Sequence, residues 1–96
     1  MSQPAAHRNP LPSVVSIVDE IRAQAAKELG TDVGQIGADT VLKQLPGADS
    51  VRLLRVVAQT ERTYDVEFED EDVFRVRTPQ DLAELVVRQL PDGGPK

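Results

Sequence analysis

The sequence predicts an all-α fold, a small bundle of three main helices and one short helix. Three stretches place apolar residues at helical intervals of three and four positions, and each stretch begins at a residue that caps helices well. No alternation of apolar and polar residues is long enough to indicate a strand. With 96 residues, of which 40% are hydrophobic, the chain has enough apolar material for one thin core. We therefore expect a single domain.

The first main helix is expected to run from a cap at Ser13 to about Leu29. Gly30 is placed to end this helix in a left-handed conformation. Charged residues occupy one side, which is typical of a solvated face. The opposite face is apolar and consists of Val14, Ile17, Val18, Ile21, Ala25 and Leu29.

A long loop is expected between residues 31 and 47, which include glycines at 34, 37 and 47. Long loops in small domains usually serve a function. The residues expected to anchor this loop to the core are Val33, Ile36, Val41, Leu42 and Leu45.

The second main helix is expected from about Ser50 to Tyr64. Leu54 lies in the middle of its predicted apolar face, so we expect Leu54→Ala to cost about 2–5 kcal/mol of stability. The full predicted face is Val51, Leu54, Val57 and Ala58, with Leu53 and Val56 beside it. A polar stripe on the same helix consists of Arg52, Arg55, Gln59 and Arg62.

Six acidic residues and no basic residue lie between Asp65 and Asp72. Four of these acids would favour the start of a short helix that reaches about Val76, because acids stabilise a helix N-terminus. The segment lacks the spacing and the glycine of a calcium loop, so we do not predict a calcium site. The apolar residues expected to pack inward here are Phe68, Val73, Phe74 and Val76.

The last main helix has three start signals together. Thr78 can cap it, Pro79 suits the first helical position, and Asp81 lies at the capping-box position. Its predicted apolar face is Leu82, Leu85, Val86 and Leu90. The folded domain is thus expected at 13–90, between flexible tails at 1–12 and 91–96.

Composition excludes several classes of function. The 16 acidic residues against 11 basic ones give a formal charge of −5, and no run of Lys or Arg is present to neutralise the phosphates of nucleic acid. Cysteine is absent, so the chain encodes no disulfide and no thiol nucleophile. The single histidine, His7, has no partners for a catalytic or metal site. We expect no catalytic residue, no metal and no membrane span, and hence a cytoplasmic monomer.

One stretch, Gly47-Ala48-Asp49-Ser50, combines a glycine turn with the start of a helix. Asp49 and Ser50 are both good helix caps, and capping alone is one interpretation of the pair. A serine at a helix start also offers a phosphate backbone donors and the positive end of the helix dipole. The stretch is therefore equally suited to hold a phosphodiester.

This motif resembles that of the phosphopantetheine-carrying acyl and peptidyl carrier proteins, in which Gly-x-Asp-Ser opens the second helix. The runs Asp39–Leu42, Tyr64–Phe68 and Thr78–Leu82 resemble further parts of the family pattern, and the resemblance covers roughly residues 13–90. The chain departs from that pattern at Leu45-Pro46-Gly47, because family members usually have leucine directly before the motif glycine. The approach to Ser50 is therefore expected to differ locally.

The resemblance implies that Ser50 is the attachment point for a 4'-phosphopantetheine arm, which a separate phosphopantetheinyl transferase transfers from coenzyme A. It implies that Asp49 helps to hold the Mg²⁺ of that transferase. The chain would then catalyse nothing itself, and its acyl group would be carried as a thioester on the imported thiol. The family also implies a seat for the acyl chain between the second and third helices, here at Leu54, Phe68 and Phe74; packing in the core is the other interpretation of these residues.

Partner enzymes are expected to load and process the acyl group: an adenylating enzyme, an acyltransferase or a ketosynthase. Fatty-acid carriers usually display acids along the second helix, whereas this chain has arginines there. The expected docking residues are Val51, Arg52, Arg55 and Arg62, and a merely solvated stripe is the alternative. A free-standing acyl carrier of polyketide or other secondary-metabolite biosynthesis is the leading hypothesis. A peptidyl or aminoacyl carrier and a non-catalytic helical interaction module are the alternatives.

Overall fold

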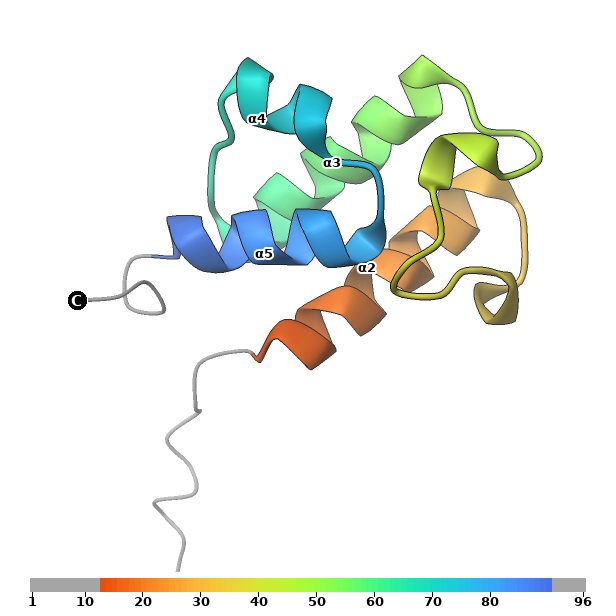
Figure 1. Ribbon diagram of the computed structural model, residues 1–96, viewed down its shortest axis with the longest axis horizontal. Coiled ribbons are helices and arrows are strands. Elements are labelled where there is room, and N and C mark those ends of the chain that lie inside the picture. The colour runs from red at the N-terminus through yellow and green to blue at the C-terminus, as the bar shows by residue number, and fades with distance from the viewer. Residues whose placement is uncertain (1–12, 91–96) are drawn as a thin grey trace, which may run out of the picture.

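Four helices and two short 3₁₀ turns make up residues 13–90, the part of the chain that the computed structural model describes (Figure 1). The predicted bundle of three long helices and one short helix is confirmed. His7 and the tails predicted at 1–12 and 91–96 lie outside the described residues. The elements in chain order are α2 (Val14–Leu29), η1 (Val33–Gln35), η2 (Leu42–Gln44), α3 (Ser50–Tyr64), α4 (Asp70–Arg75) and α5 (Pro79–Gln89).

The helix boundaries follow the capping signals in the sequence. At the start of α2 the Ser13 hydroxyl accepts a hydrogen bond from the Ser16 backbone N–H, and the helix ends at Gly30 with φ of 70°. At the start of α5 both halves of the predicted capping box are present, between Thr78 and Asp81. Local side-chain chemistry therefore fixes where these two helices begin.

The core lies between α2 and α5, which pack against each other more extensively than any other pair of helices among the described residues. Their facing side chains lose all or nearly all contact with solvent, and α3 covers the remaining side of α2. The predicted faces of α2 and α5 are confirmed. Their fully buried apolar side chains are Ile17, Ile21, Ala25, Pro79, Leu82, Ala83, Leu85 and Val86.

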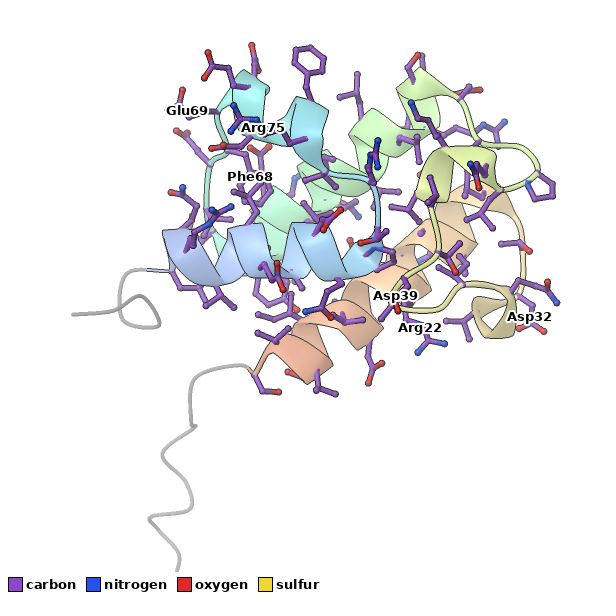
Figure 2. The ribbon with its side chains drawn as sticks, in the orientation of Figure 1. Arg22, Asp32, Asp39, Phe68, Glu69 and Arg75 are labelled. Carbon is purple, nitrogen blue, oxygen red and sulfur yellow. The ribbon has the colours of Figure 1, made fainter. Side chains whose placement is uncertain are left out.

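The loop between α2 and α3 is tied to the bundle at several points, rather than being irregular throughout. Arg22 of α2 is labelled in Figure 2. Its side chain donates hydrogen bonds to the carbonyls of Ile36 and Val33. The Leu42 N–H donates to the Arg77 carbonyl at 2.9 Å. Ile36 and Leu42 are buried anchors as predicted, but the prediction for Val33 was wrong, because its side chain is exposed.

The predicted inward face of α3 was right for Val57 and wrong for its other three residues, because the observed face is rotated about the helix axis. Val51 and Leu54 are exposed, by 59% and 55%, and Ala58 is exposed as well. The inward side of α3 includes the polar residue Thr60, which is fully buried and whose hydroxyl is satisfied by donating to the Val56 carbonyl one turn earlier. The observed inward face consists of Leu53, Val56, Val57, Thr60 and Tyr64.

The short helix α4 forms as predicted, but its side chains do not pack as predicted. Phe74 was expected to point inward and is 85% exposed. Val76 and Phe68 are half-buried against the core, and no side chain of α4 itself is buried. With only six residues, α4 is too short to bury a continuous apolar face.

Candidate functional site

The segment Leu45–Ala48 forms the tight turn that leads into α3. The Ala48 N–H donates to the Leu45 carbonyl at 3.1 Å, which closes a four-residue turn with Pro46 and Gly47 at its centre. Gly47 has φ of 84°, the value required at the third position of a type II turn, and proline suits the second position. The unusual proline before the motif glycine is therefore part of a regular turn.

Asp49 caps α3 and leaves Ser50 at the first helical position. The Asp49 carboxylate accepts a hydrogen bond from the Arg52 backbone N–H at 2.8 Å. The prediction that Asp49 caps this helix is therefore confirmed. Ser50 makes no side-chain hydrogen bond to the described residues and is exposed. Its hydroxyl is thus free for a reaction at the positive end of α3.

A mostly apolar groove of about 420 Å³ begins at Ser50 and lies between α3, α4 and η2. Ser50, Leu53, Leu54 and Val57 line it at helical intervals of three and four, so the groove follows one stripe of α3 for about 10 Å at 1.5 Å per residue. Its buried lining residues are Leu42, Val56 and Leu82, and its exposed ones include Leu54 and Phe74.

The structure brings two of the three predicted acyl-chain residues together and leaves the third apart. Leu54 and Phe74 both line the groove that begins at Ser50. Phe68 instead lines a separate hollow of about 480 Å³ near the C-terminal end of α3. Most of the lining of that hollow is polar, and the lining does not include Ser50.

The predicted docking arginines on α3 are partly engaged within the molecule. Arg55 forms an ion pair with the Glu28 carboxylate of α2 at 3.2 Å, and Arg52 approaches the Asp49 carboxylate at 3.7 Å. Arg62 lies two turns away, where its side chain donates to Gln59 at 3.3 Å. Arg52 and Arg55 remain largely exposed, and Val51 lies beside them.

Sequence reasoning missed two cationic residues at the groove, Lys43 and Arg77. They are 34 positions apart and come from two different connections, so no local pattern could have linked them. The backbone hydrogen bond from Leu42 to Arg77 joins the two connections. Leu53 and Val57, by contrast, could have been found, because they follow Ser50 at helical spacing.

Neither a metal site nor a membrane span is found among residues 13–90. No three potential ligands of the His, Cys, Asp and Glu types gather in a way that could hold an ion. None of the described helices is both long enough and apolar enough to cross a bilayer.

Residues 19–86 match the family model described as "Phosphopantetheine attachment site". The chain belongs to this family of carrier proteins. Members hold a covalent phosphopantetheine group and are non-catalytic carriers. The turn, the exposed serine and the groove described above fit that group, because they offer a hydroxyl, a helix N-terminus for the phosphate and an apolar surface for the arm.

Two curated acyl carrier proteins are similar to the chain over most of its length. One, from an Exiguobacterium species, is 31% identical over 74 residues, which are 77% of this chain and 94% of the relative. The other, from onion yellows phytoplasma, is 28% identical over 75 residues, or 78% of this chain and 99% of the relative.

A solved structure shares the fold of this carrier. It is the NMR structure of the "HMG-ACPI domain from CurA module" of Lyngbya majuscula. The TM-score is 0.73 and the match covers 90% of this chain and 89% of that one. The sequence identity is 20%, so this likeness concerns the fold alone.

Proposed function

We propose that Ser50 is the residue of this carrier that receives 4'-phosphopantetheine from coenzyme A. The single observation that supports this assignment best is the exposed Ser50 hydroxyl at the first position of α3, at the head of the groove. In the transfer, the Ser50 oxygen forms a bond to the phosphorus of coenzyme A that bears the pantetheine, and the bond to 3',5'-ADP breaks. The hydroxyl proton leaves to a base of the transferase, because no histidine or unpaired carboxylate of the described chain is hydrogen-bonded to Ser50.

Asp49 has two compatible roles in this proposal. Its Oδ1 atom caps α3, and its Oδ2 atom lies 3.7 Å from the Arg52 Nε atom on a side chain that is 60% exposed. The contact of Oδ2 with Arg52 is longer than a hydrogen bond, so this oxygen can still become a metal ligand, and hard cations such as Mg²⁺ prefer oxygen ligands. We assign the second oxygen to the Mg²⁺ held by the transferase.

The loaded arm carries an acyl group as a thioester on the terminal thiol of the pantetheine, since the chain itself contains no cysteine. Enzymes that add, extend and remove the acyl group are the required partners. A pathway of polyketide or other secondary-metabolite biosynthesis is favoured by the Gly-Ala-Asp-Ser motif and by the arginines on α3. A peptidyl carrier, which often has histidine before the serine, is the second candidate.

The surface beside Ser50 is the proposed contact for those partners. An enzyme that receives the arm must approach Val51, Arg52 and Arg55, because these residues lie within about two turns of the attachment point. Complementary charge mainly speeds encounter and selects partners. The cognate enzyme is therefore expected to present an acidic or mixed surface to α3, with Arg62 at the far end of the contact.

The attachment is tested by intact-mass spectrometry after incubation with coenzyme A and a broad-specificity phosphopantetheinyl transferase. One phosphopantetheine mass should be added to the parent and none to Ser50→Ala. Because Asp49 rather than Ser50 caps α3, Ser50→Ala should keep its helical circular dichroism. Ser16→Ala, which removes another exposed helical serine, is the matched control and should be modified like the parent. Modification of Ser50→Ala, or no modification of the parent, would contradict the assignment.

A further inference from the structure

The two cations at the groove, Lys43 and Arg77, differ from Arg52 and Arg55 of α3 because they form no ion pair within residues 13–90. Arg52 and Arg55 each approach a carboxylate within 4.0 Å. Lys43 and Arg77 form no ion pair and no side-chain hydrogen bond with any described residue. The Arg77 backbone N–H does bond to Asp81, but its guanidinium does not. Arg52 and Arg55 thus have carboxylate partners among the described residues, whereas Lys43 and Arg77 at the groove do not, and Arg62 at the far end of α3 contacts only the Gln59 amide.

The placement of Lys43 and Arg77 is fixed by the backbone and not by their own side chains. Lys43 lies in η2, and Arg77 lies in the connection between α4 and α5. The hydrogen bond from the Leu42 N–H to the Arg77 carbonyl joins these segments at 2.9 Å, and Leu42 and Arg77 line the same groove. The only acidic residue in the lining is Asp49, whose carboxylate already lies beside Arg52. An apolar groove with two free cations and one compensated acid is suited to an occupant with an apolar body and an anionic end.

We infer that this groove binds acyl groups that end in a carboxylate, with Lys43 and Arg77 as the residues that select the charged end. This inference rests on the proposed attachment of the arm to Ser50. The tether supplies the occupant at a high effective concentration, so a weak charge contact is sufficient for selection. The methylenes of the acyl group would contact Leu54, Val57 and Phe74, which line the groove.

The test compares two arms of equal length that differ only at the end. A broad-specificity transferase loads Ser50 from adipyl-coenzyme A or from hexanoyl-coenzyme A, and intact mass first reports whether each arm is attached. Amide chemical shifts of ¹⁵N-labelled protein then report occupancy of the groove. We expect the adipyl arm to occupy the groove about two- to fivefold more than the hexanoyl arm, which is the range for exposed ion pairs, and to lose this advantage at high salt.

The double variant Lys43→Gln/Arg77→Gln should make the two arms equivalent. Lys27→Gln/Arg88→Gln is the matched control, because it removes two exposed cations of the same types from other surfaces and should keep the preference. Equal occupancy by both arms in the parent would overturn the inference while leaving the carrier function intact. The inference would also be overturned if the protein with an unacylated arm already showed the full change in the amide chemical shifts of Lys43 and Arg77. The two cations would then bind the phosphodiester and not the acyl carboxylate. Absence of any added arm would instead contradict the attachment to Ser50 and the inference with it.

Discussion

The two sides of this bundle use apolar residues in opposite ways. On the α2 and α5 side, six side chains of α2 and five of α5 are buried, and they form the core. On the α3 and α4 side, α3 buries two side chains and α4 buries none, while Leu54 and Phe74 remain exposed. A small domain would be more stable with these residues buried. Their exposure beside Ser50 agrees with the proposed role of this side in contacts with other molecules.

The sharpest test of this contrast exchanges a leucine for alanine on each side. Leu82 is fully buried between α2 and the groove, so Leu82→Ala should cost about 2–5 kcal/mol of unfolding free energy. Leu54 is 55% exposed, so Leu54→Ala should cost less than about 1 kcal/mol, contrary to the expectation from sequence. Urea denaturation measures both. Equal losses would show that the two sides do not differ as described.

Helix caps extend the comparison to the ends of the helices. Thr78 and Asp81 satisfy each other's backbone in a half-buried capping box, whereas Asp49 makes one exposed capping bond. Thr78→Ala should therefore destabilise the domain by about 1 kcal/mol, at the middle of the range for caps, and Asp49→Ala by less. Thermal unfolding followed by circular dichroism distinguishes them. A larger loss for Asp49→Ala would contradict the assignment of stability to the α5 side.

Charge on the α3 side is expected to affect partners more than stability. A malonyl transferase of fatty-acid synthesis, which meets its carriers with a basic surface, should load the phosphopantetheinylated parent slowly. Arg52→Glu/Arg55→Glu should be loaded severalfold faster at low salt, and the difference should shrink at high salt. Glu28→Gln is the control, because it removes the internal partner of Arg55 and keeps the arginines. If the loading rates depend on neither salt nor the double substitution, the arginines have no role in docking and are simply a solvated polar stripe.

The smallest expected effect concerns Tyr64, where α3 meets α2. Burial, and to a lesser degree the Glu20 carboxylate, raises the pKa of the Tyr64 hydroxyl above its ordinary value. Because the folded-state pKa is the higher one, the contribution of Tyr64 to stability is constant below about pH 10 and falls as the pH rises further. The difference in unfolding free energy between the parent and Tyr64→Phe should follow this course. A difference that is already falling between pH 7 and 9 would contradict it.

The parts that sequence predicted well are those decided by neighbouring residues. Ser13, Gly30 and the Thr78–Asp81 box act within one helical turn, so their outcome can be inferred from the local sequence. The face of α3 could not be inferred in this way. A hydrophobic pattern treats Thr60 as polar and places it outside, but its hydrogen bond to the Val56 carbonyl permits burial. The inward side of α3 therefore includes Val56 and Thr60, and Leu54 is exposed.

The candidate site also contains some residues that a local motif predicts and others that it does not. The exposed Ser50 and the capping Asp49 follow from a four-residue motif, and the structure has both at the start of α3. The groove could be predicted only in part, because Phe74 lines it and Phe68 does not. Lys43 and Arg77 meet through a tertiary backbone contact between two connections, and such contacts leave no periodic signal in a sequence.

The turn at Leu45–Ala48 has a consequence for how quickly this carrier can change partners. Proline restricts the unfolded chain at position 46, and glycine accepts φ of 84° at position 47 without strain. The segment before Ser50 therefore needs little ordering when an enzyme binds, so less of the binding free energy is lost to entropy. If Ser50 is the attachment point, as proposed, an ordered segment beside it would let the carrier form short-lived complexes with its enzymes in turn, each released without refolding.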